Sequence, residues 1–179
     1  PGEFLENVRI DLFQDEVYVF TPRGEIKTLA NGATTVDFAY MIHTEVGNRC
    51  TGAKVNGRLV PLKYELQNGD IVEILTSPNQ RPRRGWLDMV KTSRARARIR
   101  SWFRREERDK AYALGREICE RELKKHDMTL KRLVKSGHIK VLLKSLRCNS
   151  LDDMLVKVGS GATEATQRLE SVEAVAAWL

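Results

Sequence analysis

The stretch "NGATTVDFAYMIHTEVG", residues 31–47, decides the fold. Thr34 is followed three residues later by Asp37, which resembles a capping box with Asp in the usual Glu position, so a helix is predicted to begin near Thr35. At 100° per residue, four apolar side chains fall on one face of this helix: Phe38, Ala39, Ile42 and Val46. We expect this face to pack on a β-sheet.

Two further residues of the stretch matter. Gly47 is predicted to follow the helix as its C′ residue, because glycine adopts the left-handed conformation common there. His43 falls on the shoulder of the apolar face and not at its centre. It is either a satisfied structural residue or an exposed ring. An exposed ring can stack on an unpaired base and hydrogen-bond to its edge or to a ribose hydroxyl.

Short β-prone runs lie on both sides of the predicted helix. "VYVFTPRGEIKTLA", residues 17–30, contains two runs around a turn with Pro and Gly at turn positions. After the helix, Asn56-Gly57 is a hairpin signal, and "LQNGDIVEILTS", residues 66–77, is a turn that leads into a strand. The order of two strands, a helix and two strands predicts an α+β chain that begins with a β-grasp domain.

Charge is unevenly distributed along the chain. Residues 1–78 hold 7 Lys and Arg against 11 Asp and Glu, residues 81–147 hold 22 against 8, and residues 148–179 hold 2 against 5. A middle segment this basic predicts a surface for phosphate-rich partners. The alternative is a solvated helical face in which arginine serves only as a good helix former.

The segment "KTSRARARIRSWFRREE", residues 91–107, places arginines on both sides of an apolar stripe if it is helical. Alternating Arg and Ala is also compatible with a strand, but both residues favour a helix. The candidate contacts to RNA phosphates or to an acidic protein surface are Lys91, Arg94, Arg96, Arg98, Arg100, Arg104 and Arg105. Further amphipathic helices follow, with Thr129 and Ser150 as candidate N-caps, and they predict an all-α second domain.

The sequence contains no pattern typical of a catalytic, metal or cofactor site. A glycine-rich phosphate loop and a nucleophile–base pair at useful spacing are both missing. Cys50, Cys119 and Cys148 are far apart and lack metal-ligand spacing, which predicts free thiols in a reducing cytoplasm. Apolar runs stay short of the ~20 residues of a membrane span. We therefore expect a cytoplasmic binding module that uses neither cofactor nor membrane.

Five motifs carry a resemblance to a known family. They are "VFTPRGE", "DFAYMIHTEVG", "VNGRLVPL", "NGDIVEILTS" and "WLDMVKTSRAR", in one order over residues 19–96. The chain resembles the TGS domain and following helical domain of the RelA/SpoT-type bifunctional (p)ppGpp synthetases/hydrolases. The resemblance implies a C-terminal regulatory fragment with a linker at 1–15, a TGS domain at 16–77, a helical domain at 78–158 and a linker or tail at 159–179.

The resemblance also implies partners. Both catalytic domains would lie upstream, so this chain would be no enzyme, while its parent would be a GTP pyrophosphokinase and 3′-diphosphatase. In ribosome-bound members the TGS domain contacts the 3′ CCA end of deacylated tRNA through the histidine that corresponds to His43, and we assign Thr44 and Arg49 to the same contact. The family motif often has a second histidine at the position of Asn48. Ribosomal RNA would meet the arginines. The alternative partner is acyl carrier protein or the enzyme's own catalytic domains.

Overall fold

The computed structural model describes residues 15–161. Most of the predicted linker at 1–15 and the part of the predicted tail after residue 161 lie outside the described residues. The chain divides into two compact units between Trp102 and Phe103, which are called here the first and the second unit. The predicted boundary between the TGS and helical domains after residue 77 stays a prediction.

Five strands, arranged in a two-stranded and a three-stranded sheet, form the frame of the first unit. Its strands are β1 (Glu16–Phe20), β2 (Ile26–Ala30), β3 (Cys50–Val55), β4 (Arg58–Val60) and β5 (Val72–Thr76). β1 pairs antiparallel with β2, and β3 pairs antiparallel with β4 and β5. Phe20 N donates to Asp70 O at 2.8 Å, and a parallel bridge joins Phe20 to Ile71. This contact joins the end of β1 to the residue before β5 and so connects the two sheets, and the arrangement confirms the predicted β-grasp fold.

Two of the predicted turns rest on left-handed backbone. Asn56 and Gly57, between β3 and β4, have φ angles of 51° and 80°, as a tight hairpin turn requires. Gly24, between β1 and β2, has a φ of 86°, and its N–H donates to Thr21 O at 2.9 Å. The turn signals in the sequence are thus confirmed, and they fix the register of both hairpins.

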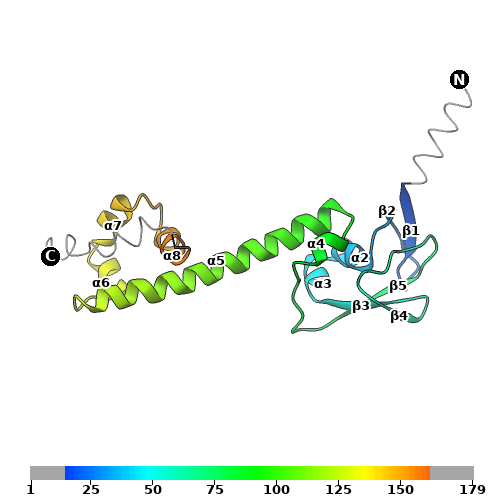
Figure 1. Cartoon of the computed structure of the whole chain (residues 1–179), viewed down its shortest axis with the longest axis horizontal. Helices are drawn as coiled ribbons and strands as arrows, with labels where there is room; N and C mark the ends of the chain where they lie inside the picture. The colour runs from blue at the N-terminus through cyan, green and yellow to red at the C-terminus, as the bar shows by residue number, and fades with distance from the viewer. Residues whose placement is uncertain (1–14, 162–179) are drawn as a thin grey trace, which may run out of the picture. The chain divides into compact units, whose positions relative to one another are not determined.

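Helix α2 (Thr35–Ile42) packs on β3 and β5 of the three-stranded sheet (Figure 1). The predicted capping box is confirmed, since Thr34 N donates to Asp37 Oδ2 at 2.8 Å and Asp37 N donates to Thr34 Oγ1 at 3.4 Å. Phe38 and Ala39 are fully buried. Phe38 belongs to a core cluster with Val17, Val19, Leu29, Ala33, Ala53, Val55, Leu66 and Val72. The predicted packing face is therefore correct for the first turns of the helix.

The prediction of one continuous helix is wrong, because the chain breaks at His43. α2 ends at Ile42, and a second short helix, α3, covers Thr44–Asn48. Gly47 is consequently an interior residue of α3 and not a C′ residue. A Cβ at Gly47 would overlap ring atoms of Tyr40, so glycine allows the ring to lie against α3. Ile42, the last residue of α2, is 45% exposed, so the predicted packing face is wrong at this position.

The segment after the sheet forms α4 (Trp86–Met89) and α5 (Ser93–Lys124). The alternating Arg and Ala residues lie in α5, which confirms the helix and excludes the strand. Within the first unit, the apolar stripe of α5 is buried at Ala95 and Ile99, both with 0% exposure. Trp86 and Val90 of the preceding segment are buried as well.

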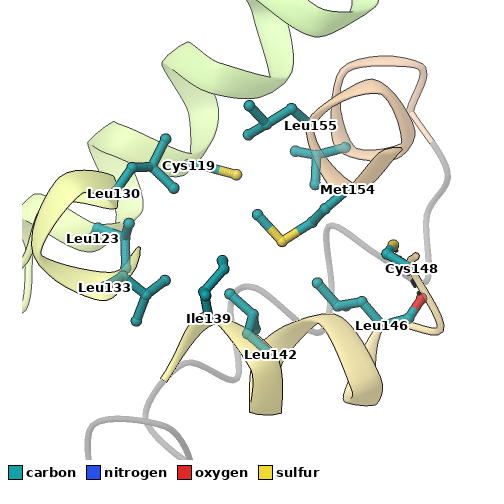
Figure 2. Close-up of a cluster of buried hydrophobic side chains, with 11 residues drawn as sticks. Cys119, Leu123, Leu130, Leu133, Ile139, Leu142, Leu146, Cys148, Met154 and Leu155 are labelled. Carbon is teal, nitrogen blue, oxygen red and sulfur yellow. Dashed lines mark hydrogen bonds between the residues drawn. The ribbon is translucent and has the colours of Figure 1, made fainter. Parts of the chain in front are cut away.

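The second unit is helical. It contains the later part of α5 together with α6 (Leu130–Lys135), α7 (Ile139–Ser145) and α8 (Leu151–Gly159). Thr129 and Ser150 accept hydrogen bonds from Arg132 N and Asp153 N, so both predicted N-caps are confirmed. Figure 2 shows side chains from all four helices meeting in one cluster, with the sulfur of Met154 directed into its centre.

Helices α5 and α8 cross at two glycines. A Cβ at Gly115 would overlap the backbone of Leu155, and a Cβ at Gly159 would overlap the backbone of Ala111. The two backbones therefore touch, and neither position has room for a side chain. This crossing brings Leu155 and Met154 of α8 onto the core side of α5, where both are buried.

Candidate nucleic-acid interface

His43 lies at the junction of two helices. It is the C-cap of α2 and the N-cap of α3, with extended backbone at φ −164° and ψ 149°. Its Nδ1 accepts a hydrogen bond from Glu45 N at 3.1 Å, and its side chain is exposed. A ring whose Nδ1 accepts carries its proton on Nε2. The imidazole is therefore fixed at one nitrogen and can donate a hydrogen bond to a ligand from the other.

The other two residues assigned to this contact lie on or beside α3. Thr44 is its first residue and is half-buried, while Arg49 is its C-cap and is exposed. Arg49 Nη2 lies 3.5 Å from Glu45 Oε2, with half of the arginine side chain exposed. His43 and Arg49 are six residues apart, about 9 Å along a helix axis. The three candidate residues thus lie at the start of α3 and at its two caps.

Asn48 has a structural role in this chain. Tyr40 OH donates to Asn48 Oδ1 at 2.8 Å, and both side chains are buried. Burial raises the pKa of the Tyr40 hydroxyl, so it remains a donor at neutral pH. Together with the contact between the Tyr40 ring and Gly47, this bond holds α3 against α2 and fixes the position of His43. Sequence reasoning missed this pair, because a Tyr–Asn bond between two helices leaves no periodic signal.

The basic residues of α5 differ in exposure. Arg94, Arg98 and Arg100 are exposed in the first unit, and Arg104 and Arg105 are exposed in the second. Arg96 is half-buried, and its Nη2 donates to Val90 O at 3.2 Å. Lys91 is exposed, but its side chain crosses Gly32, with the position of a Cβ there only 3.0 Å from Lys91 Cε. Arg96 and Lys91 thus stabilise the start of α5, while the other arginines are presented to solvent.

Asp37 is the buried acid of the first unit that sequence reasoning assigned only to the cap of α2. Its side chain is 1% exposed, and its carboxylate accepts hydrogen bonds from Thr34 and from the segment before α5. Lys91 N lies 3.0 Å from Oδ2, and Thr92 N and Thr92 Oγ1 lie 2.8 and 2.7 Å from Oδ1. The capping box has Asp37 where Glu is usual. This departure is the sequence signal that could have indicated a second hydrogen-bonding partner for the carboxylate.

The second unit carries a groove of about 360 Å³ between α5, α6 and α8. Its apolar lining consists of Tyr112, Leu130, Val134, Leu151 and Leu155. Its charged lining consists of Arg116, Lys131, Lys135 and Glu120. Glu120 Oε2 lies 3.5 Å from Leu130 N, at the start of α6. The remaining three charged residues are cations, so the lining of the groove combines apolar side chains with a net positive charge.

Cys50, Cys119 and Cys148 are free and buried thiols. Burial raises the pKa of Cys50 and of Cys119 to about 11, which keeps both protonated at neutral pH. Within residues 15–161, no group of His, Cys, Asp and Glu side chains is arranged to hold a metal ion. Over the same residues, no helix is both long and apolar enough to cross a membrane.

The fold and this surface define a class of protein: a β-grasp binding domain followed by a helical domain. A family model described as "TGS domain" matches residues 17–76, and one described as "RelA/SpoT AH domain" matches residues 102–172. The two matches together cover most of the chain. The chain therefore contains a TGS domain followed by a RelA/SpoT AH domain.

Relatives with curated names agree with this assignment. A GTP pyrophosphokinase of Myxococcus xanthus is 54% identical over 167 residues, which are 93% of this chain and 22% of the relative. The bifunctional (p)ppGpp synthase/hydrolase RelA of Mycobacterium tuberculosis is 44% identical over 94% of this chain and 24% of its own length. A guanosine-3′,5′-bis(diphosphate) 3′-pyrophosphohydrolase of Aquifex aeolicus is 45% identical over 89% of this chain and 22% of its own length. The chain thus spans less than a quarter of these relatives.

Proposed function

We propose that this chain is a regulatory region that senses deacylated tRNA on the ribosome, through the 3′ CCA end, and controls upstream catalytic domains. The observation that carries the proposal is the position of His43, an exposed imidazole held at a helix junction by its own Nδ1 bond. A fixed ring loses little conformational entropy when a base stacks on it. The proposal places the protein in the cytoplasm, where ribosomes are.

The chemistry of a tRNA 3′ end fits the three residues around α3. An unpaired terminal base can stack on the His43 ring, while Nε2 donates to the base edge or to a ribose hydroxyl. Arg49 can contact a phosphate, and the Thr44 hydroxyl can bind a ribose or phosphate oxygen. An aminoacyl ester would occupy a terminal ribose hydroxyl and add bulk beside the ring. Such a site would therefore favour deacylated over aminoacylated tRNA.

The exposed arginines of α5 would supply the remaining contacts with RNA. Arg94, Arg98 and Arg105 follow one side of the helix, and Arg100 and Arg104 follow the other. One guanidinium group can donate two hydrogen bonds to one phosphate. Each phosphate that is neutralised makes the affinity for RNA more sensitive to salt. We propose tRNA and ribosomal RNA as the partners of these two rows of arginines, one on each side of α5. Lys91 and Arg96 would contribute less, because both stabilise the start of α5.

For the whole protein we propose the activity named in its relatives, GTP pyrophosphokinase and guanosine-3′,5′-bis(diphosphate) 3′-diphosphatase. The catalytic residues would lie in the part of the protein upstream of this chain. The chain itself would act without a cofactor, by binding RNA and by intramolecular contact with the catalytic domains.

Binding of tRNA with an intact or a trimmed CCA end tests the role of His43. His43→Ala should weaken binding of intact deacylated tRNA about tenfold or more, because a base stacked on a side chain contributes ~1–3 kcal/mol. Binding of trimmed tRNA should stay unchanged. His126 is another exposed histidine, so His126→Ala is the matched control. It should bind both RNAs with the affinity of the unsubstituted chain. Equal binding of intact and trimmed tRNA by the parent would contradict the proposal.

The salt dependence of binding tests the arginine rows. Replacing Arg94, Arg98 and Arg105 with Gln should reduce the log–log salt slope by roughly 2–3 units, as expected for about three lost phosphate contacts. Replacing Lys140, Lys144 and Arg147, which are exposed in the second unit, removes the same charge as a control. An unchanged slope in the α5 variant, or an equal reduction in both variants, would show that these arginines form only a solvent-exposed face of the helix and contact no phosphate.

The groove of the second unit favours a second candidate function, docking of an acidic protein, for which acyl carrier protein is the proposed partner. A lining of apolar and basic side chains fits an acidic surface that also carries apolar side chains. Val134 lines the groove at 45% exposure, and Val141 lies outside it at 62%. Val134→Glu should abolish nuclease-resistant capture of acyl carrier protein, and Val141→Glu should not. Capture that depends on RNA would exclude this candidate.

A further inference from the structure

Two helices of the first unit begin at the same buried carboxylate. Asp37 Oδ2 accepts from Thr34 N at 2.8 Å and Thr34 Oγ1 at 3.0 Å, at the start of α2. Asp37 Oδ1 accepts from Thr92 N at 2.8 Å and Thr92 Oγ1 at 2.7 Å. Thr92 Oγ1 in turn accepts from Ala95 N at 3.2 Å, which makes Thr92 the cap of α5. The side chain of Asp37 therefore accepts hydrogen bonds at the N-termini of both α2 and α5.

Each half of this junction depends on the other. A buried carboxylate is costly unless several donors satisfy it, and here backbone N–H groups and hydroxyls at helix starts are those donors. If α5 moved away, Asp37 would lose the donors from Lys91 and Thr92 while remaining at the start of α2. If α2 moved, Lys91 N and Thr92 N would lose their acceptor. The carboxylate thus resists any separation of the two helices.

The two candidate RNA contacts lie on the helices that meet at this junction. His43 follows the last residue of α2, an eight-residue helix whose third residue is Asp37. Arg94 and Arg98 lie in the first two turns of α5, directly after Thr92. We propose that Asp37 is a positioning residue that fixes α5 to α2, so that His43, Arg94 and Arg98 bind one RNA as a single rigid surface. This inference rests on the proposed function.

A rigid connection raises affinity without adding a contact. When two sites on one molecule bind the same ligand, the second contact forms at an effective concentration set by how well the sites are held in register. A looser junction would lower that effective concentration and leave each separate site unchanged. Loss of Asp37 should therefore reduce the gain that the CCA end adds to tRNA binding. It should spare the binding of short RNAs that contact either site alone.

Two variants test the junction, Asp37→Asn and the near-isosteric Thr92→Val. Asp88→Asn, which changes an exposed acid of α4, is the matched control. We expect both test variants to bind intact deacylated tRNA about tenfold more weakly than the parent. The affinity for trimmed tRNA should stay within about twofold of that of the unsubstituted chain. The affinity for a CCA trinucleotide, measured from the NMR shifts that it causes at His43, should also stay within about twofold. The control should match the parent in all three measurements.

The outcomes separate this inference from the proposed function. If His43→Ala leaves the binding of intact tRNA unchanged, the proposed function fails whatever Asp37 does. If His43→Ala weakens binding but both junction variants bind intact tRNA like the parent, Asp37 is only a helix cap and the inference fails. Loss of trinucleotide binding in the junction variants would also overturn it, because Asp37 would then maintain the His43 site itself. If Asp37→Asn does not fold, Thr92→Val decides, and unfolding of both would make Asp37 a folding residue.

Discussion

The two units of this chain hold themselves together by different means. Within residues 15–161, all of the buried polar or charged residues lie in the first unit: Thr34, Thr35, Asp37, Asn48 and Asp70. Both units also have a buried core cluster, with nine side chains in the first unit and eleven in the second. Buried hydrogen bonds therefore add to the specificity of the first unit, whereas the second depends on the shape of its helix surfaces.

Asp70 illustrates the first kind of stabilisation. Its carboxylate accepts from Asn56 Nδ2 at 3.0 Å, Tyr64 OH at 3.2 Å and Gln67 N at 2.8 Å. These donors come from a hairpin turn and from the loop that leads into β5. Like Asp37, one buried acid joins separate segments of the chain, although its donors here lie within 14 residues of it. Each such bond requires one residue type in one orientation, so the first unit tolerates few substitutions at these positions.

The second unit shows the other kind. α6 and α7 contain six and seven residues, which is too short for stability as isolated helices. They depend on burial of Leu133, Ile139 and Leu142 against α5 and α8. The Gly115–Gly159 crossing then sets how closely α8 approaches. Apolar side chains of similar volume can replace one another in such a core, but nothing can be added at the crossing.

The largest effect is expected at that crossing. Gly115→Ala should lower the free energy of unfolding by about 3 kcal/mol or more, because the added methyl group meets backbone atoms of Leu155 that cannot move independently. Gly85→Ala, where no atom lies within 4 Å and φ is −59°, is the control and should be neutral. Urea unfolding followed by circular dichroism would measure both. Equal stability of the two variants would mean that α8 packs differently.

In the first unit, the corresponding position is Gly47. Gly47→Ala should lower the free energy of unfolding by about 2 kcal/mol, because the ring of Tyr40 must move and its bond to Asn48 is lost. The cost is smaller than at Gly115 because a side chain gives way instead of a backbone. Gly52→Ala is the control, since its Cβ would lie 3.4 Å from Val60 O in ordinary contact. Thermal melting of both variants checks the prediction.

The buried thiols allow the two units to be compared by pH. Burial raises the pKa of Cys50 in the first unit and Cys119 in the second from 9.0 to about 11. A raised folded-state pKa gives stability that is complete below pH 9 and is lost as the pH rises toward 11. Unfolding free energy should fall by up to about 3 kcal/mol per thiol over this window. Cys50→Ala and Cys119→Ala should each flatten the alkaline slope, and an unchanged slope would contradict thiol burial.

The smallest effect on stability is expected at His43. His43→Ala loses one hydrogen bond, from Glu45 N to Nδ1, and opens no cavity because the ring is exposed. The cost should stay below about 1 kcal/mol. Ser150→Ala removes the N-cap of α8 and serves as the comparison in the second unit, with a cost of about 1 kcal/mol. A much larger loss at His43 would make it a core residue.

The sequence by itself determined the local elements. The capping box at Thr34, the Asn56-Gly57 turn and the N-caps at Thr129 and Ser150 depend on neighbouring residues, so pattern alone predicts them. The same holds for the helical state of the Arg/Ala segment, because propensity and periodicity agree there. The family resemblance supplied His43 as a candidate site, and the sequence alone left its orientation open.

Tertiary structure decided everything that depends on residues far apart in the chain. The helix break at His43 arises where the Tyr40 ring packs on Gly47 and bonds to Asn48, and helical periodicity contains no sign of that contact. The second partner of Asp37 lies 54 and 55 residues away, at Lys91 and Thr92. A pattern of spacing reports which face of a helix is apolar. Only folding shows which buried polar group meets which, because the energy of a hydrogen bond depends on distance and direction between its atoms.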